Sequence, residues 1–288
     1  MTAVQQTDKM WAPLVEALVE ALENHETTGV WKQPWISMQH TNAATLRPYQ
    51  SMNALALSVA CWKKPRSHAI WATYKQWQSL GLQVKKGATG TALWTPPRFI
   101  NKDADDGSKI RMRIHAGVFY VFNADDVEGF VPPEEISETQ RLVDAEFFLH
   151  KQNPKVVFGD PTKAFYAPSE DFINMPEFVQ FKSPAAYYAT LSHELVHWTG
   201  HKTRLDRLSK DQGAAYAIEE LVAEFGSAMI CSHLGIESET RADHEQYLGL
   251  WYKRIKTEPD IVRKCVLKAS QAFNYINSKS TEEESANV

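Results

Sequence analysis

The chain has 288 residues, of which 43% are hydrophobic, and a formal net charge of −4, so it is long enough for one large domain or two ordinary ones. No stretch approaches the ~20 apolar residues that a membrane-spanning helix needs, and acidic residues interrupt the region where a secretory signal would begin. Cys61, Cys231 and Cys265 lie far apart without a C-x-x-C pair, which argues against a disulfide framework and a cysteine-bound zinc site. The sequence therefore predicts a soluble, cytoplasmic protein with reduced thiols.

The first half of the chain predicts a small α+β unit. Apolar residues at helical spacing predict three helices, over Thr7–Glu26, within Leu46–Trp62 and over Trp71–Gly81. Short runs rich in β-branched and aromatic residues, separated by turn residues, predict four strands at Gln83–Lys86, Thr91–Thr95, Arg111–His115 and Val118–Phe122. A hairpin loop is expected at Asn101–Lys109.

This half is also strongly basic. Between Gly29 and Tyr120, eight lysines and five arginines face only three aspartates, a net charge of +10, so the rest of the chain carries −14. The same window holds six of the nine tryptophans. Cations that follow phosphates, interleaved with rings that stack on unpaired bases, are typical of proteins that bind single-stranded nucleic acid. A duplex target is less favoured, because no helix-turn-helix or zinc-finger pattern is present.

Individual DNA-binding candidates follow from this interpretation. The candidate phosphate contacts are Arg47, Lys75, Lys85 and Lys86. The candidate stacking residues are Trp31, Trp35 and Trp71. Taken one at a time, each tryptophan also fits a core position in a small domain, and the sequence leaves both interpretations open.

The segment Phe130–Ser137 contains two consecutive prolines and predicts a linker, which divides the chain into domains at 1–130 and 138–280, with a linker at 131–137 and a flexible polar tail at 281–288. Beyond the linker the sequence predicts a helix and three short strands, at Glu138–Lys151, Lys155–Phe158, Ala164–Ala167 and Phe172–Met175. Further helices are predicted at Ser183–His197, Ala215–Ile230 and, as a helical tail, His244–Ile276.

The run His193-Glu194-Leu195-Val196-His197 is the most informative motif of the chain. On the predicted helix Ser183–His197, two histidines four residues apart lie on one face, so both imidazoles can reach the same metal ion. The glutamate between them projects beside that ion, where it can act as a general base on water. The helix itself is well specified, since Ser183 is suited to its cap and Pro184 to its first turn.

A catalytic zinc site usually has three protein ligands, so one more is expected from a neighbouring element. The helix predicted at Ala215–Ile230 bears Glu220 and Glu224 at i and i+4. We assign Glu220 as the third ligand and Glu224 as the carboxylate that orients a ligand histidine. Glu219 and Glu224 remain competitors for the ligand position. A three-histidine site is disfavoured because the pattern H-E-x-x-H-x-x-G-x-x-H needs histidine where this chain has Thr203.

Seven segments, in order, resemble the ArdC family of antirestriction proteins. In the first half they are Gly29–Trp35 (GVWKQPW), Pro48–Leu57 (PYQSMNALAL), Trp71–Gly90 (WATYKQWQSLGLQVKKGATG) and Phe119–Val127 (FYVFNADDV). In the second half they are Ala164–Pro176 (AFYAPSEDFINMP), His193–Gly200 (HELVHWTG) and Tyr216–Gly226 (YAIEELVAEFG). The resemblance covers nearly the whole chain, although relatives tend to have an apolar residue and a glutamine near Asn123–Asp126.

This resemblance implies an α+β protein in which a small single-stranded-DNA-binding domain precedes a zincin-like metallopeptidase domain with a short sheet. It implies that His193, His197 and Glu220 bind Zn²⁺ or another divalent ion such as Mn²⁺, that Glu194 is the catalytic base, and that the protein protects incoming plasmid or phage DNA. A host restriction-enzyme subunit is then the expected substrate or target. An extended substrate is expected to add as a strand to the edge formed by Phe172–Met175.

A rival interpretation is a DNA-binding shield whose metal site is structural or idle. In that case protection comes from coating DNA or from blocking the restriction enzyme, and Glu194 has no catalytic part. The sequence alone keeps both interpretations open.

Overall fold

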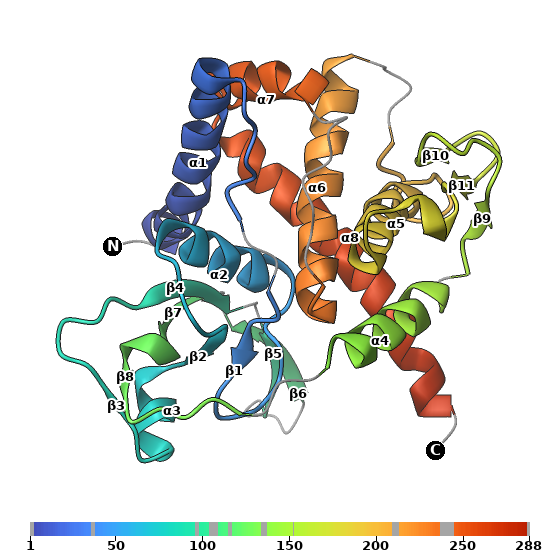
Figure 1. Cartoon of the computed structure of the whole chain (residues 1–288). Coiled ribbons are helices and arrows are strands. Elements are labelled where there is room, and N and C mark those ends of the chain that lie inside the picture. Colours follow the sequence, from blue (N-terminus) through green and yellow to red (C-terminus); the bar gives the residue numbers. More distant parts are fainter. Residues whose placement is uncertain are drawn as a thin grey trace.

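The computed structural model describes residues 3–35, 38–95, 98–103, 109–114, 117–133, 137–151, 153–208, 213–236 and 245–286. Within these ranges helices and small sheets combine into an α+β fold, as the sequence predicts (Figure 1). No helix among the described residues has the length and apolar character needed to cross a bilayer.

The N-terminal half is built on a four-stranded sheet in the order β1-β2-β7-β4. These strands are β1 (Thr41–Asn42), β2 (Ile70–Ala72), β4 (Thr91–Thr95) and β7 (Gly117–Asn123). Two long helices accompany the sheet, α1 (Ala3–Thr28) and α2 (Ser51–Lys63), and α2 packs directly against β4. Leu93 of β4 and Val121 of β7 lie fully buried in a cluster with Leu57 of α2, so one face of the sheet is core.

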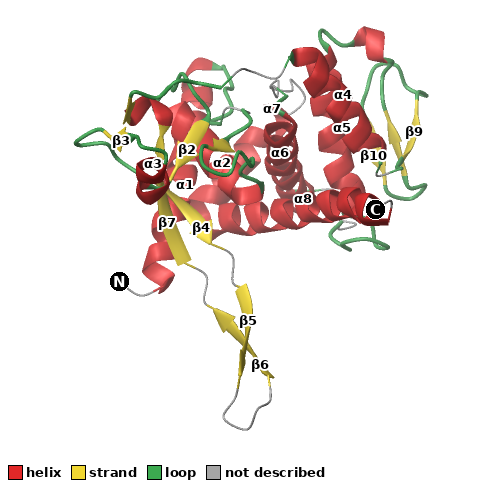
Figure 2. Ribbon diagram, turned by 90° about the horizontal axis from the view of Figure 1, so that it is seen from below, coloured by secondary structure: helices red, strands yellow, loops and turns green. Residues whose placement is uncertain are grey.

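Shorter elements complete this half. They are α3 (Tyr74–Ser79), β3 (Gln83–Val84), the 3-10 turn η1 (Ala124–Asp126) and β8 (Val127–Glu128). A two-stranded ribbon, β5 (Arg98–Asp103) paired with β6 (Lys109–Ile114), continues from β4 and leads back into β7. Figure 2 shows this ribbon projecting away from the body of the protein.

The C-terminal half packs helices on one side of a three-stranded sheet of order β10-β11-β9. Its strands are β9 (Lys155–Val157), β10 (Phe165–Ala167) and β11 (Phe172–Asn174), preceded by α4 (Glu138–His150) and followed by the 3-10 turn η2 (Phe178–Gln180). Four helices follow, α5 (Pro184–Thr199), α6 (Ala214–Leu234), α7 (Glu245–Thr257) and α8 (Asp260–Ala286). The helix α6 packs against both α5 and α8 and forms the centre of this half.

The two halves share one hydrophobic core. Apolar residues of α1 and α2 belong to the same buried cluster as those of α5, α6, α7 and α8. The contacts run mainly between α1 and α7, and between α2 and both α6 and α8. Apolar packing therefore continues across the boundary that is expected between an N-terminal and a C-terminal domain.

The tryptophans expected to stack on DNA bases are buried, Trp31 and Trp35 in this shared core and Trp71 in the cluster between α2 and the four-stranded sheet. Trp31, Trp35 and Trp71 are only 8%, 2% and 1% exposed. Trp31 contacts Trp251 and Trp35 contacts Phe225, both edge-on or tilted, at centroid distances of 6.3 and 5.4 Å. The expectation that these three rings stack on bases is wrong for this fold, because stacking would require the core to open.

Several predicted elements differ from the observed ones. The helix predicted from Trp71 begins at Tyr74, because Trp71 belongs to β2 and the capping box of Thr73 with Gln76 starts the helix later. The predicted loop Asn101–Lys109 is partly strand, in β5 and β6. The single helical tail is two helices, separated at Glu258–Pro259, and α8 runs on to Ala286 into the expected flexible tail. The predicted ends His115 and His244 lie outside the described residues.

Candidate metal centre

The helix α5 forms as its sequence specifies. Ser183 caps it, because its hydroxyl oxygen accepts a hydrogen bond from the Ala186 amide at 3.1 Å, and Pro184 occupies the first turn. The whole second half of the helix is buried, including His193, Glu194 and His197. The ligand-bearing turns are thus held by packing rather than left on a mobile surface.

Two glycines allow other segments to approach this helix closely. A side-chain carbon on Gly226 of α6 would lie 2.6 Å from Val196, so only glycine permits α5 and α6 to cross at this distance. A side-chain carbon on Gly200 would lie 2.9 Å from Leu208 and 3.0 Å from Arg207. The chain that follows α5 can therefore fold back over its C-terminal end.

At this crossing His193, His197 and Glu220 converge, and their ligand atoms all lie within 4.8 Å of one another. The two Nε2 atoms are 3.1 Å apart, and each is 3.4 Å from a Glu220 carboxylate oxygen. Bonds of ~2.0–2.1 Å to a tetrahedral ion would place neighbouring ligand atoms roughly 3.3–3.4 Å apart. The three side chains therefore fit the ligand set of one divalent ion.

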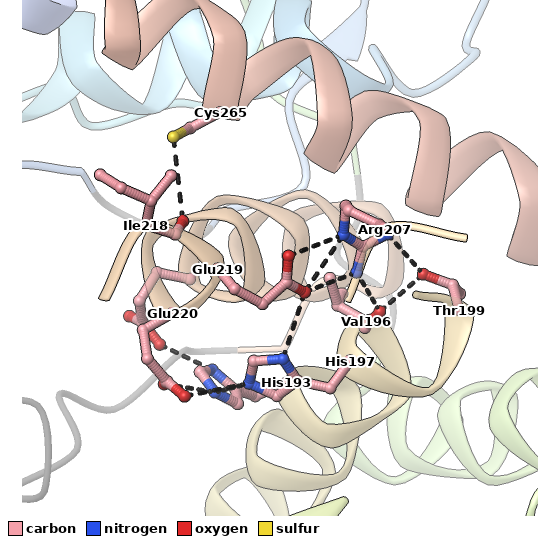
Figure 3. A network of polar contacts seen from close by, with 10 residues as sticks. His193, Val196, His197, Thr199, Arg207, Ile218, Glu219, Glu220 and Cys265 are labelled. Atoms are coloured by element: carbon pink, nitrogen blue, oxygen red, sulfur yellow. Dashed lines mark hydrogen bonds and ion pairs between the residues drawn. The ribbon is translucent and has the colours of Figure 1, made fainter. Parts of the chain in front are cut away.

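Each ligand histidine is oriented by its own carboxylate, and Figure 3 shows the one at His197, which belongs to Glu219. His193 donates from Nδ1 to Glu224 at 2.8 Å, and His197 donates from Nδ1 to Glu219 at 3.3 Å. This arrangement leaves both Nε2 lone pairs directed at the ion position. Glu224 lies where the sequence predicted an orienting carboxylate, whereas Glu219, which was considered as a ligand, holds the second histidine instead.

Arg207 is a component of this centre that the sequence did not identify. Its guanidinium binds Glu219 at 2.8 and 2.9 Å and also donates to the Val196 carbonyl and the Thr199 hydroxyl (Figure 3). The side chain is only 5% exposed. Because a bidentate arginine fixes the plane of a carboxylate, Arg207 sets the direction in which Glu219 holds His197.

The electrostatics of the centre favour a cation. Four carboxylates, those of Glu194, Glu219, Glu220 and Glu224, are buried or nearly so around the histidine pair. Burial lowers the pKa of His197, but the neighbouring Glu220 and Glu219 outweigh it and raise the pKa to about 10. An excess of buried negative charge over buried positive charge destabilises a fold. A divalent ion bound among these carboxylates would offset that destabilisation.

A small cavity of about 90 Å³ opens onto the centre. His193, Glu194, His197 and Glu220 form its floor, and Tyr216 and Tyr247 line it from the helical side. The Tyr216 ring is parallel to that of His197, with centroids 6.5 Å apart, and its hydroxyl is hydrogen-bonded to Glu220. Burial and the Glu220 charge both raise the pKa of Tyr216, so its phenol remains a proton donor. Tyr216 is not among the site residues that the sequence predicted.

The opposite wall of the cavity comes from Phe165 and Tyr166 on β10 and from the residues flanking that strand. The Tyr166 hydroxyl donates to Asp171 at 2.7 Å, and Arg204 binds the same carboxylate. Arg204 also lies over the Trp198 ring, 3.9 Å from its centroid. Its contacts with Asp171 lower the pKa of that carboxyl to about 2. This ion pair ties the β10–β11 hairpin to the end of α5, which fixes the width of the cavity.

The candidate phosphate contacts lie far from this centre in the fold. Arg47, Lys75, Lys85 and Lys86 are all exposed, on the sheet-bearing half. Lys85 donates from Nζ to the Asp125 carbonyl at 2.9 Å. Asp125 and Asp126, in the segment where the sequence departs from the family pattern, bind His68 and Arg66 at 2.6 and 2.7 Å. The residues that differ from the family pattern therefore have a structural role, because their ion pairs hold the segment before β2 against η1.

A buried H-E-x-x-H helix crossed by a glutamate-bearing helix, beside a small sheet, defines a zincin-like metallopeptidase fold. The family model of zincin-like metallopeptidases matches residues 143–271, and the model of the N-terminal domain of the anti-restriction factor ArdC matches residues 8–128. The chain belongs to the ArdC family of antirestriction proteins.

Relatives and solved structures agree with this assignment. An uncharacterized protein, y4eC of Sinorhizobium fredii, is 36% identical over 251 residues, which cover 84% of this chain and 81% of that protein. A DNA primase TraC of Escherichia coli is 33% identical over 287 residues, and this match covers 91% of the chain but only 19% of the primase.

The fold is similar to that of the antirestriction ArdC protein from plasmid R388. Its metal-free crystal structure matches with a TM-score of 0.69 and 27% identity, and its Mn(II)-bound structure with a TM-score of 0.67 and 26% identity. Each match covers 93% of this chain and 98% of the solved one.

Proposed function

We propose that this protein binds single-stranded DNA, hydrolyses peptide bonds at the centre formed by His193, His197 and Glu220, and thereby protects incoming plasmid or phage DNA from restriction. The main support is that convergence of two histidines and one glutamate, with a carboxylate behind each imidazole and Glu194 beside them in one cavity. The peptide substrate that we propose is a subunit of a host restriction enzyme.

The residues divide the chemistry among them. A divalent ion held by the three ligands, either Zn²⁺ or Mn²⁺, would supply Lewis acidity that activates water and polarises the scissile carbonyl. Glu194, buried on the cavity floor, accepts the proton of the attacking water and returns it to the departing amine nitrogen. Tyr216 lines the same cavity with a protonated phenol, whose single O–H is bonded to Glu220 in this structure. By turning from Glu220, it would donate a hydrogen bond to the oxygen on which charge develops.

The sheet offers an edge for an extended peptide, although not the one that the sequence suggested. The strand at Phe172–Asn174, β11, is central and is paired on both sides, with β10 and β9. The expectation that this segment is the substrate edge is therefore wrong. Among the described residues β10 pairs only with β11, and it lines the cavity, so we assign its free edge to the peptide.

The DNA-binding part of the proposal rests on charge and exposure. The window from Gly29 to Tyr120 carries +10, and Arg47, Lys75, Lys85 and Lys86 extend from its surface. The match to a protein named DNA primase also places such a segment in a protein that acts on DNA.

Glu194→Gln tests the proposal. Glutamine has nearly the same shape but cannot accept the proton, so cleavage of a restriction-enzyme subunit should fall by at least ~10²-fold. Metal content, thermal stability and DNA binding should remain those of the wild type, because Glu194 is not assigned as a ligand. A matched control is Glu170→Gln, an exposed glutamate outside the cavity lining.

Transfer of unmodified DNA into a restricting host distinguishes a peptidase that protects DNA by cleavage from a DNA-binding shield. If cleavage protects DNA, Glu194→Gln loses protection although it still binds DNA and metal. Full protection by Glu194→Gln would contradict the peptidase mechanism and would favour the shield, in which the metal site is structural or idle.

A further inference from the structure

An aromatic surface lies on the side of the four-stranded sheet opposite α2. Because Leu93 and Val121 face the core, strand alternation places Trp94 and Tyr120 on the other face, together with Phe122. Tyr120 is 55% exposed, and Tyr74 at the start of α3 is 41% exposed. Exposed large rings in a segment of net charge +10 are unlike the buried tryptophans of the same segment.

Two of these rings are in direct contact. Tyr74 meets Phe122 edge-on at a centroid distance of 6.3 Å. A side-chain carbon on Gly90 would lie 3.2 Å from the Phe122 ring and 3.2 Å from Cβ of Tyr120, so the backbone at Gly90 lies against both residues. We call Tyr74, Trp94, Tyr120 and Phe122 the aromatic face.

Positive charge borders the aromatic face. Lys75 follows Tyr74 on α3, and Lys86 lies in the turn that leads to Gly90, where Gly87 has a φ of +84°. Both lysines are exposed, and neither has a carboxylate partner among the described side chains. Lys64 and Arg66, by contrast, both form ion pairs with Asp126. Lys75 and Lys86 are therefore available to an external anion.

The β5–β6 ribbon leads away from the sheet. It continues β4 and β7, the two strands that carry Trp94 and Tyr120 (Figure 2). The sequence of the ribbon contains five cations, Arg98, Lys102, Lys109, Arg111 and Arg113.

We infer that the aromatic face is where single-stranded DNA binds, with bases stacked on Tyr74 and Tyr120 and phosphates on Lys75 and Lys86. This inference rests on the proposed DNA binding and replaces the buried Trp31, Trp35 and Trp71 as stacking residues. Rings and lysines side by side suit unpaired bases, which expose both a π-face and a flanking phosphate. A duplex hides its bases, so it gains only the contacts to its phosphates.

The test uses the full chain and a fluorescent oligo(dT), because the two halves share a core. Tyr74→Ala and Tyr120→Ala should each weaken binding by about 5- to 100-fold, whereas Tyr74→Phe and Tyr120→Phe should bind within about 2-fold of wild type, since phenylalanine keeps the ring. Phe147→Ala removes a ring that is 60% exposed on α4 and serves as the control. Lys75→Ala and Lys86→Ala should each lower the slope of log K against log salt by about 0.7.

Cross-linking of oligonucleotides that contain 5-iodouridine locates the contact independently of affinity. The inference predicts adducts on the peptides that contain Tyr74 or Tyr120. If wild type and both alanine variants bind oligo(dT) equally and remain folded, or if adducts map elsewhere, the aromatic face is not the site although the protein does bind DNA. If wild type does not bind oligo(dT), the proposed DNA binding fails as well.

Discussion

The two halves of the molecule use buried histidines in opposite ways. In the sheet-bearing half, His40 is fully buried without a carboxylate, and it accepts a hydrogen bond from Trp71 while its other nitrogen contacts the Ser58 hydroxyl. Burial lowers the pKa of His40 to about 3. In the helical half, carboxylates surround His193 and His197 and favour a positive charge. The sheet-bearing half therefore keeps its buried histidine neutral, whereas the helical half surrounds its buried histidines with charge.

This difference indicates how each half functions. A polyanion such as DNA can be bound by exposed lysines, so a buried histidine in that half can remain neutral and serve only for packing. A metal ion needs convergent ligands in a site that excludes water, so the helical half accepts the cost of burying carboxylates. Substitutions in the shared core, around the metal ligands and at the neutral histidine test this difference between the halves.

The shared core should give the largest effect. Trp251 of α7 is fully buried, contacts Trp31 and donates its indole N–H to the Ala217 carbonyl at 2.6 Å. Trp251→Ala should lower the free energy of unfolding by about 3–5 kcal/mol, because it leaves a cavity and removes the hydrogen bond to Ala217. Leu250→Ala, at a neighbouring position that is 46% exposed, should change it by less than about 0.5 kcal/mol.

Chemical denaturation, monitored by two probes, measures the free energy of unfolding of these variants. Tryptophan fluorescence and far-ultraviolet circular dichroism should shift together in Trp251→Ala, as one transition. Two separate transitions, with only one displaced, would show that the halves unfold independently in spite of their common core.

The second prediction concerns the carboxylate behind His193. Glu224→Ala removes the acceptor of the His193 Nδ1 proton, so the imidazole loses its fixed orientation. The affinity for a divalent ion should fall by about 10- to 100-fold, while the number of ions bound per chain at saturation is unchanged. Calorimetric titration with Mn²⁺ gives both quantities. Unaltered affinity would show that packing alone orients His193.

The third prediction concerns acid. The folded pKa of His40, about 3, lies below the unfolded value of 6.5, so the stability that its neutral form provides is present above pH 6.5 and is lost as the pH falls toward 3. Between pH 7 and pH 5 this histidine should account for a loss of ~2 kcal/mol. Urea titrations of His40→Asn should show a weaker dependence on pH than those of wild type, and His25→Asn should match wild type. If His40→Asn and wild type show the same pH dependence, His40 is not the source of the loss of stability in acid.

Local patterns predicted most of the fold and the core of the site. The i,i+4 histidines and the Ser183 cap are properties of one helix, so the sequence of α5 was sufficient for them. Glu220 could be predicted as the third ligand because only a few acidic residues follow at a suitable distance on the next helix. The α+β class followed from the succession of helical and alternating patterns.

The remaining features depend on contacts between distant segments. Glu219 and Glu220 are neighbours, and only the crossing angle of α5 and α6, which Gly226 permits, decides which of them faces the ion. Arg207 becomes part of the site because the chain folds back past Gly200. Trp31 is buried by α7, from the far end of the chain, so its own neighbours in sequence gave no sign of its core position.

The central claim is that Glu220, and not its neighbour Glu219, completes the metal centre with the two histidines. Elemental analysis and calorimetric titration of wild type, Glu220→Ala and Glu219→Ala test it most directly. Wild type should bind about one divalent ion per chain, Glu220→Ala should bind none at micromolar protein, and Glu219→Ala should still bind one, with an affinity about 10- to 100-fold lower because His197 is less well oriented. An ion retained at wild-type affinity by Glu220→Ala, or lost only from Glu219→Ala, would contradict the account.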